Sequence, residues 1–467
     1  MGSVRRGQKT ARSVVRKTAP NKPATGADNP AEQRLEAYLA KQNPKPGPLF
    51  GSVLAKRDHY AAGANGIPYV YEGGVYVRAS QLVKRRIQEI AGQAWSKHIQ
   101  NEVEAWLAAN SPPLDLDALG PDRINVRNGI LEWNGKRWAL KKHDPSYRTT
   151  VQYPVAFDPD ATCEEYDGFL KSSLPEEAVR AVADEWMGYN LTSDYRFHKA
   201  LMTTGESGSG KSVYLEVVAA LVGHDNVASL ALRELASDTF ATADLYGKAA
   251  NICTDIESAE LRHTGLFKRL VAGEVIRGQA KHKDAFSFRN TAKLSFSANE
   301  IPSTRDTTSA FFERWLVMIF PHRFRDTPKD KRNLRKLITD SEREMSGVLN
   351  RALAGLTRLR RQGNFTTSRS AAEARAFFRQ RADGFASWLI EIPPGTPERQ
   401  QRDDWYWLYA RWCETSGHHP LSSTRFYERA RKWDGSLGVA VKATKSKGYE
   451  YFTINYGVGE GSGTDSL

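Results

Sequence analysis

The sequence predicts an α/β core flanked by an amino-terminal α+β unit and a carboxy-terminal unit of helices and a hairpin. Two observations support the core. Strand-like and helix-like stretches alternate over residues 196–322, and a glycine-rich loop stands at one strand-to-helix junction. A third observation supports the last unit, because residues 403–454 contain helix, turn, helix and hairpin signals in that order. A chain of 467 residues is too long for one core, so we expect about two to four units.

The composition indicates what class of partner the protein binds and in which compartment it acts. The formal net charge of +13 and the isoelectric point near 9.5 favour a polyanionic partner such as nucleic acid, with a surplus that serves only solubility as the alternative. The three cysteines lie far apart, which is typical of isolated thiols in a reducing compartment. Because no apolar run of about 18 residues and no secretion signal is present, we expect no membrane span and a cytoplasmic, DNA-associated protein.

Composition and pattern divide the chain into six segments. Seven basic residues precede the first acid, Asp28, so the amino-terminal segment is expected to be a disordered basic tail, either solvated or in contact with phosphates. The expected segments are this tail at 1–48, an adaptor and oligomerisation domain at 49–195, the α/β core at 196–325, a helical lid at 326–374, the helix-and-hairpin domain at 375–456 and a disordered tail at 457–467.

Strand and helix signals run through the adaptor segment. Residues 69–77 alternate around a Gly-Gly turn and predict a hairpin, and residues 123–133 predict a second one. Residues 81–108 and 175–189 have helical periodicity. No catalytic group of residues is evident there, which favours an adaptor role.

The glycine-rich loop is the most specific feature of the chain. It fits the pattern G-x-x-x-x-G-K-[ST] in full, between a strand-like segment at 199–204 and an apolar helical run at 213–222. Glycines let successive N–H groups point at phosphate oxygens, and the dipole of the following helix adds positive charge. Lys211 is expected to reach the β- and γ-phosphates and Ser212 to ligate Mg²⁺, so the sequence predicts ATP and Mg²⁺ binding; a surface loop that matches by chance is the alternative. The predicted phosphate-binding loop consists of Gly205, Glu206, Ser207, Gly208, Ser209, Gly210, Lys211 and Ser212.

Acidic and amide side chains follow two further strand-like stretches. Asp255 and Glu257 come directly after residues 249–254 and would share one face of a strand. We assign Asp255 to Mg²⁺ and Glu257 to the activation of water, with a solvent-facing acidic strand end as the alternative. Asn299 ends the next strand, where its amide either orients water against the γ-phosphate or starts a turn.

Arg314 is the candidate for a guanidinium that acts between subunits. It stands just ahead of an apolar strand, and in a head-to-tail ring it can reach a neighbour's γ-phosphate and stabilise charge in the transition state. A surface salt bridge is the alternative, and Arg305 is a weaker candidate for the same role.

Two basic segments are candidates for DNA contact. Residues 274–288 predict two short arms around a basic tip, which would line the channel of a ring or form a solvated turn. The helix, turn, helix and basic hairpin at 403–454 describe a winged helix, used either for DNA or for subunit contacts. We assign to DNA the tip residues Lys281, His282 and Lys283, the recognition-helix residues Arg425, Arg429 and Lys432, and the wing residues Lys442, Lys445 and Lys447.

In this order the motifs resemble the phage and plasmid primase-helicase family with poxvirus-type superfamily 3 helicase domains. The resemblance covers roughly residues 65–455, most of the chain. It is carried by the phosphate-binding loop and by the segments 124–131, 186–191, 254–257, 267–274, 296–302 and 311–320.

The resemblance implies an α/β fold with a P-loop AAA+-like superfamily 3 helicase core, an amino-terminal α+β adaptor domain and a carboxy-terminal winged-helix domain. It implies a ring, usually a hexamer, that moves along DNA and unwinds it with 3′→5′ polarity. It also implies the roles argued above for Lys211, Ser212, Asp255, Glu257, Asn299 and Arg314. The chain departs from the family pattern twice. The residues before 65 are too few for a primase fold, and the Asp-x-Glu acids are not adjacent, which leaves the choice of catalytic base open.

These features favour a replicative DNA helicase of a mobile element that hydrolyses ATP and acts on single-stranded and forked DNA, with a separate primase or polymerase as a further partner. One alternative is an origin-binding initiator whose ATP site mainly drives assembly. A packaging or remodelling ATPase is a second alternative, disfavoured by the order of the motifs and by the lack of a nuclease-like acid cluster.

Overall fold

The structure is a computed structural model. It describes residues 46–91, 95–114, 119–237, 239–254, 264–279, 284–299, 304, 306, 308–367, 369–393, 396–416, 418–433 and 439–456. The tail expected at 457–467 lies outside these residues, and the tail expected at 1–48 does so up to Pro46, which begins helix α2 (Pro46–Arg57). Within the described part of the chain, no helix is at once long enough and apolar enough to cross a membrane.

Five parallel strands form the central sheet. Across the sheet their order is β13-β7-β12-β9-β8. β7 pairs with β12 on one side and β13 on the other, so that Leu201 lies between Ser295 and Leu316. A parallel sheet with helices on both faces is the α/β core that the alternating pattern predicts. The strands are β7 (Ala200–Thr204), β8 (Val227–Ala228), β9 (Ala250–Cys253), β12 (Lys293–Ala298) and β13 (Trp315–Ile319).

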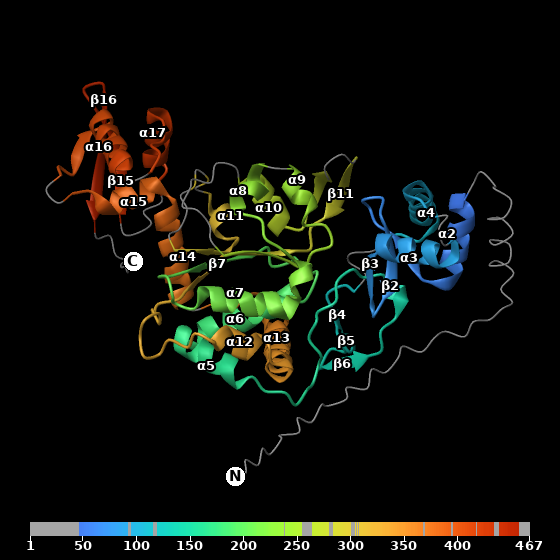
Figure 1. Ribbon diagram of the computed structural model, residues 1–467. Helices are drawn as coiled ribbons and strands as arrows, with labels where there is room; N and C mark the ends of the chain where they lie inside the picture. The colour runs from blue at the N-terminus through green and yellow to red at the C-terminus, as the bar shows by residue number, and fades with distance from the viewer. Residues whose placement is uncertain are drawn as a thin grey trace, which may run out of the picture.

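Helices cover both faces of this sheet (Figure 1). Each face has its own apolar core; Leu201 points into one and Met202 into the other, as the alternation of a strand requires. One face is covered by α5 (Glu164–Ser173), α6 (Glu177–Asn190), α7 (Lys211–Val222), α12 (Leu334–Thr339) and α13 (Glu342–Gln362). The other is covered by α8 (Leu232–Ser237), α9 (Thr239–Ala243), α10 (Gly265–Val271), α11 (Ser309–Phe312) and the hairpin of β10 (Val275–Gln279) and β11 (Ala285–Arg289).

The amino-terminal unit is a small α+β layer with its own core. The hairpin expected around the Gly-Gly turn is present as β2 and β3, and Gly73 and Gly74 both have positive φ angles, of 62° and 97°. The helical stretch expected at 81–108 forms two helices. The unit consists of α2, β1 (Tyr60–Ala62), β2 (Pro68–Glu72), β3 (Val75–Arg78), α3 (Ser80–Ala91) and α4 (Lys97–Asn110).

A second small sheet joins this unit to the core. Its antiparallel strands are β4 (Arg123–Val126), β5 (Gly129–Trp133) and β6 (Trp138–Lys141), and a 3₁₀ turn, η2 (Pro145–Tyr147), follows. Buried residues of β4 and β5 share one apolar core with α5, α6 and α13. The boundary expected at 195 therefore moves to a point before β4, and α12 and α13, expected as a separate lid, belong to the same core.

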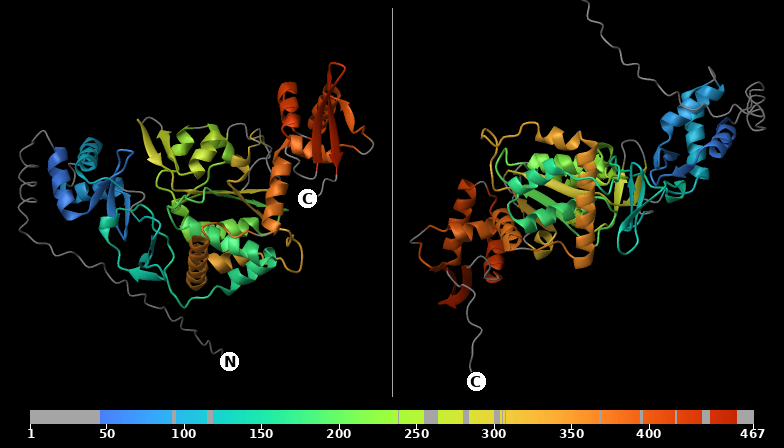
Figure 2. Two further views of the ribbon diagram at one scale, coloured as in Figure 1. Left: turned by 180° about the vertical axis from the view of Figure 1, so that it is seen from behind. Right: turned by 90° about the horizontal axis from the view of Figure 1, so that it is seen from below.

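The carboxy-terminal unit has the order expected from the sequence. The helices expected at 403–415 and 422–432 are observed as α16 and α17, and a three-stranded antiparallel sheet of order β14-β16-β15 packs on them. Lys447 and Gly448 form the hairpin turn with φ angles of 48° and 84°. The unit lies at the opposite end of the molecule from the amino-terminal unit (Figure 2). It consists of α15 (Gly384–Glu391), β14 (Arg399–Gln401), α16 (Arg402–Thr415), α17 (Ser423–Arg431), β15 (Val439–Ser446) and β16 (Tyr449–Tyr456).

Helix α14 (Arg369–Ala382) connects the core to this unit. The ring of Phe378 lies 5.5 Å from that of Trp315 at the start of β13. At the end of α14, Asp383 caps α15 by accepting the N–H groups of Phe385 and Ala386 at 3.1 and 3.3 Å. Because α14 packs on the core, the boundary expected at 374 moves to Asp383.

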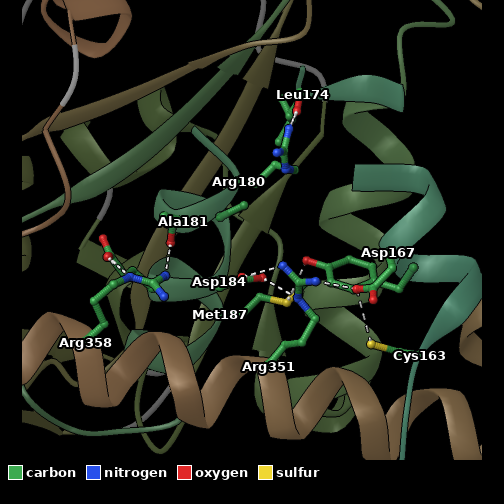
Figure 3. Close-up of polar contacts among 12 residues, drawn as sticks. Cys163, Asp167, Leu174, Arg180, Ala181, Asp184, Met187, Arg351 and Arg358 are labelled. Carbon is green, nitrogen blue, oxygen red and sulfur yellow. Dashed lines mark hydrogen bonds and ion pairs between the residues drawn. The ribbon is translucent and has the colours of Figure 1, made fainter. Parts of the chain in front are cut away.

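A buried ion network ties α5, α6 and α13 together (Figure 3). Arg351 donates to the two carboxylate oxygens of Asp184 at 3.1 and 2.7 Å, and also to Asp167. Arg358 pairs with the fully buried Glu185 at 2.7 Å. Burial raises the pKa of Asp184 even though Arg351 bonds to it, so the ionised carboxylate depends on that guanidinium.

Arg351→Ala is expected to destabilise the core by about 3 kcal/mol, because it leaves Asp184 as an uncompensated buried charge. The loss should shrink as the pH falls. The folded-state pKa of Asp184 is already raised, and without Arg351 it rises further, so acid neutralises the carboxyl and removes the penalty. Urea midpoints across a pH series would measure this, with Arg343→Ala, an exposed arginine of α13, as the control. Equal shifts in the two variants would contradict the assignment.

Candidate phosphate-binding site

The glycine-rich loop connects β7 to α7, as the sequence predicts. Gly205, Gly208 and Gly210 have φ angles of 142°, 81° and 105°, a range that glycine adopts readily and other residues rarely do. The chain therefore turns sharply at the carboxyl end of β7 and enters a twelve-residue helix whose amino end carries a positive dipole.

Lys211 and Asn299 meet at this edge of the sheet. Nζ of Lys211 donates to Oδ1 of Asn299 at 3.1 Å and to the carbonyls of Gly205 and Glu206 at 2.5 and 2.9 Å. Asn299 directly follows β12, and β12 pairs in parallel with β7, so both strands end at the same edge. The structure thus brings together two predicted site residues that are 88 positions apart in the chain.

Two serines of the loop fit an anionic ligand. Ser209 is 1% exposed, and its hydroxyl has no hydrogen-bond partner among the described residues. Buried hydroxyls normally have a partner, and a ligand oxygen would supply one. Ser212 lies exposed in the first turn of α7, where its hydroxyl suits Mg²⁺. Backbone N–H groups, an ammonium and hydroxyls together are donors that suit phosphate oxygens.

The segment after β13 closes over the loop, which the sequence did not indicate. The N–H of Phe320 donates to the Thr204 carbonyl at 2.8 Å, and that of Phe324 donates to the Gly208 carbonyl at 2.9 Å. Arg325 follows, and its Cβ would lie 2.5 Å from a Cβ atom on Gly208, so an exposed arginine stands next to the loop. Its place in a run of charged residues gave no signal of this contact.

Helix α5 holds the other side of the loop. A Cβ atom on Gly210 would lie only 3.0 Å from one ring carbon of Phe169 and from the hydroxyl oxygen of Ser173. The glycines in the motif indicate that something approaches closely, but the motif alone does not show that the approaching helix precedes it in the chain.

Gly205→Ala is expected to weaken nucleotide binding by at least about tenfold. The added methyl would stand 2.4 Å from the carbonyl oxygen of Phe320, and the φ of 142° is strained for alanine. A tenfold loss corresponds to about 1.4 kcal/mol, and strained backbone typically costs about 1–3 kcal/mol. Titration with a fluorescent ATP analogue measures it. Gly448→Ala is the matched control, because its φ is also positive but open space surrounds it. Unchanged affinity in Gly205→Ala would show that the loop is not the site.

The two predicted acids, Asp255 and Glu257, lie outside the described residues. The strand before them is described: β9 pairs in parallel with β12, with Cys253 beside Phe296. β9 therefore ends at the same edge of the sheet as the glycine-rich loop. Their roles as Mg²⁺ ligand and base stay predictions.

Arg314 lies beside the amino ends of the strands, at the opposite end of the sheet from the glycine-rich loop. Its carbonyl accepts the N–H of Ala200, at the start of β7, at 2.7 Å. The five residues of β7 separate that end from the loop by about 16 Å at 3.3 Å per residue. The guanidinium donates to the Ala310 carbonyl, and its Nε has no hydrogen-bond partner in the described part of the chain. Arg314 therefore lies away from the loop of its own chain, and its action across a subunit boundary stays a prediction. Arg305 lies outside the described residues.

The two arms expected at 274–288 are the antiparallel strands β10 and β11, paired from Val275 with Arg289 to Gln279 with Ala285. The basic tip between them, Lys281, His282 and Lys283, lies outside the described residues. Its role in DNA contact stays a prediction.

Most of the basic residues assigned to DNA in the last unit are exposed. Arg425 lies on α17 and Lys432 directly after it, and the wing side chains, Lys442, Lys445 and Lys447, are exposed as well. Arg429 is different, because its guanidinium bonds to Asp383, which is 1% exposed. We therefore correct its assignment: Arg429 holds α17 against the start of α15 and is not presented to DNA.

The fold and the loop define an α/β protein with a glycine-rich loop at the carboxyl edge of a parallel sheet. Residues 203–314 match a family model described as a family of unknown function, DUF5906, and residues 6–175 match a model described as D5 N terminal like.

The chain is also similar to the protein named "Putative helicase L207/L206" of Acanthamoeba polyphaga mimivirus, with 24% identity over 183 residues. That match covers 38% of this chain and 19% of the relative, so the chain spans about a fifth of the relative's length. Two apo structures of the NrS-1 C terminal region are similar at 11% and 13% identity, each with a TM-score of 0.44, over 89% of this chain and 100% of theirs.

Proposed function

We propose that this protein is an ATP-dependent DNA helicase that serves the replication of a phage, a plasmid or another mobile element. The observation that carries the proposal is the meeting of Lys211 and Asn299 beside a loop of three positive-φ glycines. Donors fixed in this way can hold a triphosphate and stabilise the charge that develops during its hydrolysis. The loop and Lys211 bind the phosphates of ATP, Ser212 and Asp255 ligate Mg²⁺, and Glu257 activates water.

Two kinds of observation support a helicase over other ATPases. The sequence is similar to a viral protein named as a helicase and to the D5 N terminal like model. The net charge of +13 and the exposed basic residues Arg425, Lys432 and Lys445 suit a DNA partner. The order of the motifs supports the superfamily 3, AAA+-like assignment and the winged helix, and the protein is then expected to act in the cytoplasm with a separate primase or polymerase.

The positions of Lys211 and Arg314 support a ring. Lys211 lies at the carboxyl ends of the parallel strands and Arg314 at their amino ends. A head-to-tail contact would therefore bring the guanidinium of one subunit to the loop of the next. Closed heterologous contacts generate rings, and a hexamer is the number that the resemblance implies. The tip between β10 and β11 would then line the channel around single-stranded DNA.

Strand separation on forked DNA tests the proposal. Two forks are labelled so that release from a 3′ tail and from a 5′ tail are distinguished, with Lys211→Ala as the control. Release from the 3′-tailed fork that requires ATP and is lost in the control is expected. Absence of hydrolysis with any nucleotide or DNA would overturn the proposal.

The same assay separates the second candidate, an origin-binding initiator. This candidate is favoured by exposed basic residues on both α17 and the β15–β16 turn, which could read one DNA sequence. It predicts hydrolysis without strand release, together with binding that is confined to one sequence.

A further inference from the structure

A cavity with an aromatic and basic lining lies apart from the phosphate-binding loop. It has a volume of about 700 Å³ and opens between the β5–β6 turn and the second half of α13. Its lining includes Trp133, Trp138, Lys136, Arg137 and Arg361, and no aspartate or glutamate is among the lining residues. In Figure 1, α13, β5 and β6, the elements that line the cavity, lie on the opposite side of the central sheet from β11.

The two tryptophans are held in place from behind. They face each other as a cross-strand pair, with ring centroids 5.3 Å apart and planes inclined at 51°. The indole N–H of Trp138 donates to the Thr357 hydroxyl at 3.4 Å. Arg360 places its guanidinium 5.0 Å from the ring of Trp138 and 6.0 Å from that of Trp133 without lining the cavity. Fixed rings of this kind lose little conformational entropy when a flat ligand stacks on them.

The positive charge at the mouth of the cavity is uncompensated. Lys136, Arg137 and Arg361 are exposed, and their side chains form no ion pair with any described residue. Arg358 also lines the cavity, but its guanidinium forms an ion pair with Glu185. Half-buried tryptophan rings beside free cations suit a ligand that is flat, apolar in part and anionic.

We propose that this cavity binds a single-stranded segment of nucleic acid, with an unpaired base stacked on Trp133 and the flanking phosphates at Arg137 and Arg361. Stacking tolerates any base, and the cations contact the backbone, so binding is expected to be independent of sequence. A duplex fits poorly because its bases are already stacked on one another. The site is separate from the ATP site and from the winged helix, and binding of the strand there is expected to require no ATP.

Anisotropy of a fluorescein-labelled oligothymidylate, measured without ATP, tests the proposal on the full chain. Trp133→Ala is expected to weaken binding roughly tenfold, which is the loss of one stacked base. The double variant Arg137→Gln/Arg361→Gln should make the slope of log K against log salt shallower by about 1.4, because two phosphate contacts of a single strand are lost. Arg343→Gln, at the other end of α13, is the matched control and should leave both quantities unchanged.

A crosslinking experiment locates the strand directly. An oligonucleotide that carries 5-iodouracil is irradiated with the protein, and the attached peptide is identified by mass spectrometry. Attachment at Trp133 or Trp138 supports the proposal. Attachment only elsewhere, or affinity and salt slope unchanged in both variants, overturns it, as does equal competition by a blunt duplex, which would mean that no base is stacked. Trp133 lies outside the apolar core clusters, and circular dichroism checks that each variant is folded.

Discussion

Lys211→Ala is expected to lower the rate of ATP hydrolysis at least about 10²-fold, because it removes the ammonium that faces the loop carbonyls and Asn299. Phosphate release at saturating ATP measures the effect. Lys171→Ala is the control, since this exposed lysine lies on α5, the helix whose Phe169 and Ser173 approach the loop. Hydrolysis that is reduced equally in both variants would contradict the assignment.

Arg314→Ala is expected to lower kcat about 10³-fold while the affinity for ATP stays within a factor of about two. The separation of the two effects follows from position, because Arg314 lies at the edge of the sheet away from its own loop. Binding is measured with the fluorescent ATP analogue and turnover by phosphate release. Arg335→Ala, an exposed arginine on α12, is the control. A matching loss of ATP affinity would place Arg314 within its own site.

Mixing the two inactive variants tests whether Arg314 acts between subunits. Lys211→Ala subunits supply the guanidinium, and Arg314→Ala subunits supply the intact loop. At equal amounts and with random assembly, about one interface in four has both parts, so roughly a quarter of the wild-type activity is expected. Absence of rescue at every ratio, with assembly verified by light scattering, would exclude action in trans.

Local patterns predicted the strand, glycine-rich loop and helix around Lys211 better than they predicted the domain boundaries. The strand, the glycine-rich loop and the helix lie within 23 residues of chain, from Ala200 to Val222, so the signals that specify them are adjacent. The boundary expected at 195 failed because α6 packs on α13, more than 150 positions later in the chain, through Asp184 and Arg351. The periodicity of one helix shows which of its faces is apolar, but not which distant helix packs against that face.

Two features were not predicted from the sequence: the partner of Arg429 and the start of α13. Arg429 has the spacing of a recognition-helix residue, yet Asp383, 46 positions earlier, binds its side chain. Within the segment expected as a helical lid at 326–374, the start of α13 after Ser341 was not located; the Ser341 hydroxyl caps α13 by accepting the N–H of Glu344 at 3.2 Å. The second signal was present, since Ser-x-x-Glu is the capping-box pattern. The contact between Arg429 and Asp383 can be seen only in the folded structure.

Helix α14 connects the carboxy-terminal unit to the part of the core that carries Arg314. Its Phe378 rests on Trp315, the residue next to Arg314, and its end at Asp383 grips α17 through Arg429. In the proposed ring, a shift of Arg314 toward a neighbour's phosphate would thus tilt α17, the helix proposed to contact DNA. By reciprocity, DNA that prefers one tilt must change ATP affinity at the neighbouring loop by the same factor, so each subunit would report its DNA contact to the next.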